Sequence, residues 1–220
     1  MTTIACITAK DEEETIGDLV CNLEGHGLCV VVVDDGSSDS TGEIVRRVMV
    51  RRIGMHLVTH TQSWGIGPSV LHAWSEALRL GADRIVQLDA GGSHYVGDLW
   101  RLLSQKADMV IGSRFLPSSR YIGRPWRAAL SRLAALACNA RTGQRIGDWT
   151  SGYRAFTRGA VEQLLLCPCH ARMHGCQIEV LGHAIRLGMS IAEVPITYIA
   201  NRSSFNWRAA REAFGVWSRL

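Results

Sequence analysis

The chain has 220 residues, of which 47% are hydrophobic and 20% are charged, the balance of an ordinary globular protein. This length suits one α/β domain, and the composition excludes a disordered or fibrous chain. The formal net charge is +4, with acids gathered near the start and arginines in the second half. A basic second half can face phosphate groups, anionic lipid or nucleic acid, or it can be a solvated surface.

The cysteine content and the first residues indicate the compartment. Seven cysteines, an odd number, occur in a chain that does not begin with a basic start followed by a long apolar run. We therefore expect reduced thiols and a cytoplasmic protein. The longest apolar run, 28–33, is far shorter than the ~18 residues that a membrane span requires, so the protein is expected to be soluble or peripheral to a membrane.

Strand-like and helix-like segments alternate through the first half of the chain. Short apolar runs predict buried strands over 3–8, 28–33, 55–59, 84–88 and 109–112. Helices are expected between them, from residue 11 and over 41–50, 70–80 and 96–105. This order predicts βαβ units with right-handed crossovers, and hence an α/β fold with a mainly parallel, Rossmann-like sheet flanked by helices.

The pattern changes after residue 117. We expect a long helix over 125–140, a late strand over 191–199 and a terminal helix over 207–220. Pro195 inside the late strand predicts a position at the edge of the sheet. Because there is no internal repeat and no clear linker, the chain is predicted to form one domain, 1–220.

Polar residues directly follow three of the predicted strands: Asp34 and Asp35, Asp89, and Ser113 with Arg114. Ligands of parallel α/β sheets bind at the carboxyl ends of the strands. We therefore expect these side chains to converge on one crevice, and this convergence is the central structural prediction.

The turn over 34–41 delivers two carboxylates from a buried strand. Asp34 and Asp35 can accept hydrogen bonds from a base N–H or a ribose hydroxyl. Alternatively this is an ordinary capped turn, in which Asp39 or Ser40 caps the helix that begins near Thr41.

Two further segments combine glycine with a predicted element end. Gly91 and Gly92 after Asp89 allow a close backbone approach, and the Asp89 carboxylate can bind a cation that bridges a diphosphate; a tight turn is the alternative. Gly65 and Gly67 precede a helix whose start can admit an anionic group, or they form a simple turn.

Together these segments resemble the GT-A glycosyltransferases of family 2, and within them the polyprenyl-phosphate sugar transferases of the dolichol-phosphate mannose synthase type. The resemblance covers most of the chain, from Ile4 to Arg208. It rests on the opening segment 7–16, the D-D-G-S-x-D turn, G-x-G at 65–67, G-S-R at 112–114, R-x-x-x-S at 127–131, D-x-T-S-G-Y-R at 148–154 and E-V-P-I at 193–196.

The resemblance implies roles for individual residues. Nucleotide contacts are implied for Thr8, Ala9, Glu12, Asp34, Asp35, Gly65 and Gly67. A catalytic part is implied for Asp89, Asp148, Arg114, Arg127 and Arg154, and an acceptor contact for Arg202 and Arg208. The resemblance also implies a nucleotide-sugar-binding half over 1–115 and an acceptor half over 116–220.

One departure from the family pattern concerns the metal. The family's D-x-D motif is Asp89-Ala90-Gly91 in this chain, so the second carboxylate is missing. Mg²⁺ or Mn²⁺ is the expected cofactor, held by Asp89 with His94 as a further candidate ligand, and held more weakly than by two acids.

The implied reaction is the inverting transfer of mannose or glucose from a GDP- or UDP-hexose to a polyprenyl phosphate. A phosphate acceptor needs no strong base, and arginines can hold it and the leaving diphosphate. A hydroxyl acceptor, on a glycan, a small molecule or a modified nucleic-acid base, needs a general base, for which Asp148 is the candidate. Gly91 also leaves open a nucleotide-sugar-binding protein without catalysis.

Two features stay open. The first is a cluster of cysteines and histidines, which are residue types that bind metals: Cys167, Cys169, His170, His174 and Cys176. Its C-x-C spacing departs from that of structural zinc sites. A zinc site, or buried thiols with a histidine in a loop, therefore remain alternatives. The second is the terminal helix, where Trp207 and Trp217 either seat the helix at a membrane surface or pack into the core.

Overall fold

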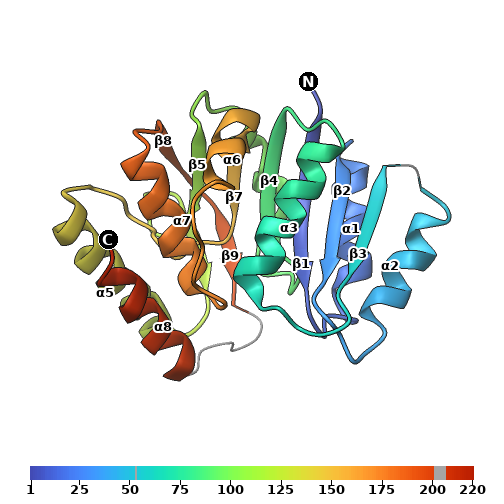
Figure 1. The fold of residues 1–220 in the computed structure, drawn as a ribbon, viewed down its shortest axis with the longest axis horizontal. Helices are drawn as coiled ribbons and strands as arrows, with labels where there is room; N and C mark the ends of the chain where they lie inside the picture. Colours follow the sequence, from blue (N-terminus) through green and yellow to red (C-terminus); the bar gives the residue numbers. More distant parts are fainter. Residues whose placement is uncertain (53, 201–206) are drawn as a thin grey trace.

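A computed structural model describes residues 1–52, 54–200 and 207–220 of the chain. Its centre is a seven-stranded sheet with the order β3-β2-β1-β4-β7-β5-β8 (Figure 1). The strands of this sheet are β1 (Thr3–Ala9), β2 (Cys29–Asp34), β3 (Met55–Thr59), β4 (Arg84–Asp89), β5 (Met109–Ser113), β7 (Arg154–Thr157) and β8 (Ile191–Pro195). A second, two-stranded sheet pairs β6 (Arg120–Ile122) with β9 (Thr197–Ile199).

The sheet is mainly parallel, as predicted. β1 pairs in parallel with β2 and β4, and β5 pairs in parallel with β8. β7 runs antiparallel to both of its neighbours and was not predicted, because its four residues form a short stretch without a clear period. β8 lies at the edge of the sheet, which confirms the prediction from Pro195, although the predicted strand 191–199 is divided into β8 and β9.

Helices cover both faces of the sheet (Figure 1). They are α1 (Ile16–Gly25), α2 (Thr41–Met49), α3 (Ile66–Arg79), the short η1 (Val96–Asp98) and α4 (Leu99–Leu103), α5 (Pro125–Thr142), α6 (Arg158–Leu164), α7 (Gly175–Arg186) and α8 (Trp207–Trp217). None of the described helices combines the length with the apolar content that a bilayer span requires.

The first helix begins five residues later than predicted, at Ile16 instead of residue 11. The acids that precede it bind the neighbouring turn: Asp11 Oδ1 accepts a hydrogen bond from Ser38 N at 2.7 Å, and Glu13 Oε2 accepts one from Ser40 N at 3.0 Å. Asp11 itself has a positive φ of 54°, which a helix does not allow. Tertiary hydrogen bonds therefore replace the expected first helical turn.

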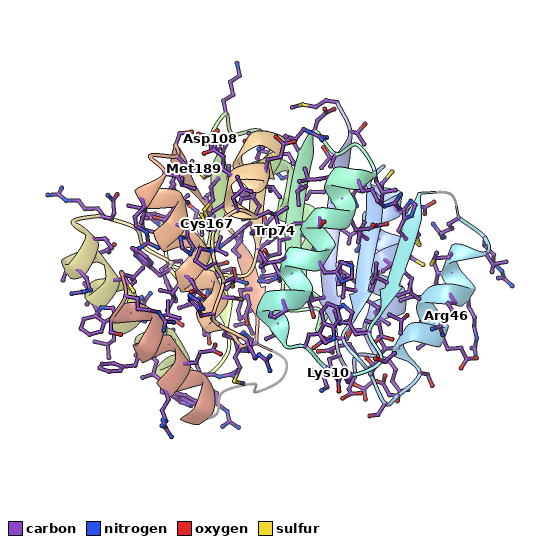
Figure 2. All side chains as sticks on the ribbon, in the orientation of Figure 1. Lys10, Arg46, Trp74, Asp108, Cys167 and Met189 are labelled. Atoms are coloured by element: carbon purple, nitrogen blue, oxygen red, sulfur yellow. The ribbon has the colours of Figure 1, made fainter. Side chains whose placement is uncertain are left out.

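The two faces of the sheet form separate apolar cores. Along β1, Ile4 and Cys6 point to one core, whereas Ala5 and Ile7 point to the other, as the two-residue period of a strand requires. On the first face Trp74 of α3 is fully buried, with its ring 4.8 Å from that of Phe156 (Figure 2). A sheet buried on both faces explains the nearly continuous apolar runs of the sequence.

The register of the sheet brings the predicted polar strand ends to one edge. Ala9 at the end of β1 lies beside Asp34, and Thr8 lies beside Asp89. β5, which ends at Ser113, runs in the same direction because two antiparallel pairings through β7 separate it from β4. The strand ends therefore lie at one edge of the sheet, as predicted, but of the polar side chains expected to converge there only Asp89 and Arg114 reach the cleft, whereas Asp34 and Asp35 do not.

Candidate active site

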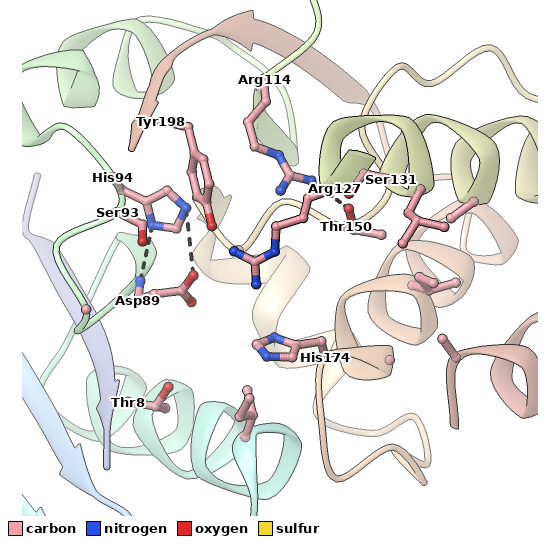
Figure 3. A pocket seen from close by; sticks show the side chains of 18 of the residues that line it. Thr8, Asp89, Ser93, His94, Arg114, Arg127, Ser131, Thr150, His174 and Tyr198 are labelled. Carbon is pink, nitrogen blue, oxygen red and sulfur yellow. Dashed lines mark hydrogen bonds and ion pairs between the residues drawn. The ribbon is translucent and has the colours of Figure 1, made fainter. Parts of the chain in front are cut away.

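A cleft of about 460 Å³ opens at this edge of the sheet. Figure 3 shows side chains around it from β4 and the loop after it, from the segment that follows β5, from α5 and from the residue before α7. Both the amino-terminal and the carboxy-terminal parts of the chain supply its walls. The polar lining includes Thr8, Lys10, Glu12, Asp89, Ser93, His94, Arg114, Arg127, Ser131, Thr150, His174 and Tyr198.

Asp89 stands where the two halves of the chain meet. It is the last residue of β4, and its side chain is 44% exposed at the cleft. On its other side the backbone of Gly152 approaches closely, since a Cβ built there would lie 2.7 Å from Asp89 Oδ1. Thr15 Oγ1 donates to Ala90 O at 2.9 Å and ties the segment before α1 to the loop after β4.

His94 is buried next to Asp89. Its Nδ1 accepts a hydrogen bond from Asp89 N at 3.3 Å, and its Nε2 lies 3.8 Å from Asp89 Oδ2 (Figure 3). Burial lowers the pKa of His94 and favours a neutral ring. With Nδ1 accepting, the single proton is on Nε2, which is buried without a hydrogen-bond partner. This N–H is therefore directed toward the Asp89 carboxylate and the cleft.

Arg114 and Asp148 form a buried ion pair at the opposite wall. Asp148 Oδ2 accepts from Arg114 Nε, and Asp148 Oδ1 accepts from Arg114 Nη2, both at 2.7 Å. Arg114 N and Thr150 N donate to the same carboxylate. Burial would raise the pKa of Asp148, but the Arg114 charge and these hydrogen bonds hold it below its ordinary value. Asp148 is not exposed and does not line the cleft, whereas Arg114 does.

The remaining wall is largely apolar. It is formed by α5, by the starts of α3 and α7 and by the middle of α8: Ile66, Trp126, Leu130, Ala134, Ile178 and Ala213. Arg127 extends from α5 toward the space between Tyr198 and His174 (Figure 3). The Arg114 guanidinium also lies 5.1 Å from the centre of the Tyr198 ring, which fixes both side chains.

Asp34 and Asp35 lie at the end of β2, outside the lining of the cleft. Asp35 is 5% exposed and accepts five hydrogen bonds, from His60 Nδ1, Ser63 Oγ, Trp64 N, Gly65 N and Ser69 Oγ. Asp34 is 4% exposed and accepts from Ser37 N at 3.0 Å. Neither lines the cleft, and Asp35 holds the segment between β3 and α3 in place.

Four other residues named in the sequence analysis are also packed away from the cleft. Gly65 and Gly67 lie against the backbone carbonyls of Arg172 and Ala171, so their missing side chains serve loop packing. Arg154 is fully buried, and it donates to Gln177 O and Trp149 O at 2.8 and 3.0 Å. Ala9 is 2% exposed beneath the turn. Arg202 lies outside the described residues, and so does the side chain of Arg208.

The described residues contain no group of three or more His, Cys, Asp or Glu side chains placed to hold a metal ion. This finding includes the cysteines and histidines of 167–176, for which zinc remained an alternative. In that segment Cys169 Sγ instead donates to Glu179 Oε2 at 3.5 Å, and Cys176 is buried.

Several lining residues were not expected from the sequence. Lys10, Tyr121, Trp126 and Tyr198 reach the cleft from four separate segments, and α7 adds Ile178. A usable signal existed for α5 alone, whose leucines recur every three residues and so form one apolar stripe along the helix.

Comparison with known proteins places the chain among sugar transferases. Residues 4–165 match the family "Glycosyl transferase family 2". The chain is 32% identical to the polyprenol monophosphomannose synthase of Mycolicibacterium smegmatis, over 98% of this chain and 86% of that protein. It is 33% identical to the undecaprenyl-phosphate mannosyltransferase of Micrococcus luteus, over 77% of this chain and 71% of that protein.

The fold resembles that of solved glycosyltransferases. Glucosyl-3-phosphoglycerate synthase from Mycobacterium tuberculosis in complex with UDP superposes with a TM-score of 0.73, covering 99% of this chain and 79% of that chain at 21% identity. A structure of the same enzyme with Mn²⁺, UDP-glucose and phosphoglyceric acid gives a TM-score of 0.70 at 20% identity. This likeness establishes the GT-A fold.

Asp35→Asn is expected to destabilise the protein. Burial alone would raise the pKa of Asp35, but the hydrogen bonds from His60, Ser63, Trp64 and Ser69 lower it from 3.8 to about 2. This difference corresponds to about 2 kcal/mol of folding free energy, present above pH ~4 and lost as the pH falls toward 2. Urea unfolding at pH 7 should show the deficit, and unfolding near pH 3 should show a smaller one.

Asp18→Asn, which alters an exposed carboxylate of α1, is the matched control. Equal stability of the Asp35 and Asp18 variants at pH 7 would contradict the structural role of Asp35.

Proposed function

The chain belongs to glycosyl transferase family 2, and we propose that it transfers a hexose, with inversion, from a nucleotide sugar to a polyprenyl phosphate. The relatives named above support this choice of acceptor, since both names refer to a polyprenyl compound or its phosphate. The proposal divides the domain into a donor half over 1–115 and an acceptor half over 116–220.

The Arg114–Asp148 pair is the observation that carries the proposal. A hydroxyl acceptor would need a general base, and the candidate from the sequence, Asp148, is occupied by Arg114 and closed off from the cleft. A phosphate acceptor is already an anion and needs cationic partners instead. Arg114 and Arg127 both line the cleft and supply them.

The nucleotide-sugar donor fits the wall of the cleft that faces Arg114 and Arg127. Thr8, Glu12 and Asp89 line the cleft at the carboxyl ends of parallel strands, where nucleotides bind in open α/β sheets. A GDP- or UDP-hexose placed there directs its diphosphate toward the Asp89 side and its sugar toward Arg114 and Arg127. Direct attack of the acceptor phosphate on the anomeric carbon then forms the new bond as the bond to the diphosphate breaks.

A divalent cation, Mg²⁺ or Mn²⁺, suits the Asp89 side of the cleft. The Asp89 carboxylate is an oxygen ligand of the kind these ions prefer, and the buried, unpartnered Nε2 of His94 marks a polar spot beside it. A bound cation would offset the negative charge that develops on the leaving diphosphate. Because burial favours the neutral ring, His94 directs an N–H toward Asp89. We therefore propose that His94 orients the Asp89 carboxylate and is not itself a metal ligand.

The outer face of α5 supports peripheral membrane attachment. Trp126, Leu130, Leu133 and Leu136 are 44%, 44%, 60% and 65% exposed, and the first two also line the cleft. The exposed arginines on or beside this helix are Arg120, Arg124, Arg132 and Arg141. An apolar stripe flanked by cations suits an anionic lipid surface and leads from that surface to the cleft. Trp217 instead packs on α5, where its Nε1 donates to Ala137 O at 3.1 Å.

The proposal is tested by transfer of labelled hexose from GDP-mannose and UDP-glucose to polyprenyl phosphate in detergent. We expect label in the organic phase with one of the donors. Asp89→Asn should lose roughly 10²-fold or more in transfer, because the cation that would offset the charge on the leaving diphosphate loses its carboxylate ligand. Nucleotide-sugar binding without transfer to any acceptor would indicate an inactive binding protein, and transfer to a hydroxyl acceptor alone would refute the phosphate acceptor.

Arg127→Ala is expected to act on the acceptor. Removing a cation from the acceptor wall should raise the KM for polyprenyl phosphate by roughly tenfold or more, because charge-assisted hydrogen bonds are worth about 1.5–3 kcal/mol, while the KM for the donor changes little. Arg145→Ala, an exposed arginine beyond the end of α5, is the control. A selective effect of Arg127→Ala on the donor KM would contradict the assignment of the two walls.

Membrane attachment is tested by sedimentation with vesicles of phosphatidylcholine that contain or lack phosphatidylglycerol. We expect binding to the anionic vesicles, weakened roughly tenfold or more by Leu133→Asp with Leu136→Asp, since both side chains must leave the interface. Leu166→Asp changes a leucine that is 86% exposed outside α5 and should bind like the wild type. Equal binding of all three proteins would exclude α5 as the contact.

A further inference from the structure

Tyr198 lies where the two walls of the cleft meet. It belongs to β9 and lines the cleft together with Asp89 on the donor side and Arg127 on the acceptor side. Figure 3 shows its hydroxyl pointing into the space between the Asp89 carboxylate and the Arg127 guanidinium. The hydroxyl therefore lies at the boundary between the place proposed for the diphosphate and the place proposed for the acceptor phosphate.

Hydrogen bonds hold the backbone of Tyr198 along both edges of β9. On one edge β9 pairs in parallel with β6. On the other edge His94 forms an antiparallel bridge with Tyr198, and Ile199 N donates to Ser93 O at 2.9 Å. The strand that carries Tyr198 is thus anchored to the loop that directly follows Asp89, so the two side chains keep a fixed relation.

Three side chains fix the orientation of the Tyr198 ring. The Tyr121 ring stacks on it, with the ring centres 5.8 Å apart and the planes inclined by 10°. The His94 ring lies 5.4 Å away, and the Arg114 guanidinium lies 5.1 Å from the ring centre. Because the ring is already ordered, its hydroxyl can bond a ligand with little further loss of conformational entropy.

The Tyr198 hydroxyl keeps its proton at neutral pH. Burial raises the pKa of Tyr198 above its ordinary value, and the negative charge of Asp89 adds to the rise. The positive charges of Arg114 and Arg127 oppose this rise in pKa without reversing it. Tyr198 is therefore a neutral group that donates one hydrogen bond and can accept another, and it is not a base for the reaction. Such a group suits the hydroxyls of a sugar.

We propose that Tyr198 determines specificity for the hexose of the donor, through a hydrogen bond between its hydroxyl and the sugar hydroxyl at C2. The inference rests on the proposed function, because it requires a nucleotide sugar in this cleft. The anomeric carbon must lie between the leaving diphosphate and the attacking acceptor phosphate, and the Tyr198 hydroxyl faces that boundary. Of the two ring atoms bonded to the anomeric carbon, one is the ring oxygen and the other, C2, carries a hydroxyl.

This contact makes the protein selective among nucleotide sugars. A site built to bond a hydroxyl rejects the analogue that lacks it, because the polar group of the protein is then left without a partner. Donors with a hydroxyl at C2 are therefore bound in preference to the corresponding 2-deoxy sugars. The preference belongs to the sugar alone, so the free nucleotide should bind independently of Tyr198.

The inference is tested by calorimetric titration of the full chain, in buffer with Mg²⁺, with GDP-mannose, UDP-glucose, their 2-deoxy analogues, GDP and UDP. The wild type should bind its hexose donor roughly three- to tenfold more tightly than the 2-deoxy analogue, the range for one hydrogen bond between neutral groups. Tyr198→Phe removes only the hydroxyl, so it should bind the two sugars alike. Its affinity for the free nucleotide should be that of the wild type.

Tyr95→Phe is the matched control, since Tyr95 is 58% exposed and does not line the cleft, and this variant should discriminate as the wild type does. A wild type that binds the hexose and 2-deoxy donors equally would overturn the inference. A Tyr198→Phe variant that retains the preference, or that loses as much affinity for the free nucleotide as for the sugar nucleotide, would also overturn it. These titrations use no lipid acceptor, so the organic-phase transfer assay decides the proposed function separately.

Discussion

β1 lies between β2 and β4, and its parallel hydrogen bonds to both strands determine which side chains reach the cleft. This register places Thr8 beside Asp89 and Ala9 beside Asp34. A shift of one residue would turn each strand's side chains to the opposite face and would bury the wrong set. The position of Asp89 at the cleft, the approach of the loop after β4 to Glu12 and the burial of the 34–41 turn all depend on this pairing.

Three acids near strand ends have different tasks because their partners differ. Asp35 accepts five hydrogen bonds and anchors the segment before α3. Asp148 accepts two hydrogen bonds from the Arg114 guanidinium and holds that side chain at the cleft. Asp89 keeps much of its carboxylate exposed to the cleft. Removing the carboxylate should therefore have a different effect at each of the three positions. Of the three acids, only Asp89 has oxygens that a ligand in the cleft can reach.

The cleft separates two kinds of chemistry. Its Asp89 side is polar and suits a diphosphate with a cation, whereas α5 contributes an apolar wall together with Arg127. Because Trp126 and Leu130 belong both to this wall and to the exposed stripe of α5, a long apolar acceptor can keep its chain on the lipid side while its phosphate enters the cleft. The buried Arg114–Asp148 pair suits such an acceptor, since it supplies positive charge without an accessible base.

Element order, the edge position of β8 and the convergence of the strand ends could be predicted from the sequence, because apolar periods and polar strand ends are local properties. The family resemblance also followed from motifs along the chain. The tasks of Asp35, Asp89 and Asp148 could not be predicted, since their partners lie up to 34 residues away and only folding brings them together. The antiparallel β7, the exposed face of α5 and the place of Tyr198 between Asp89 and Arg127 likewise arise from packing between distant segments, and the tertiary structure alone decided them.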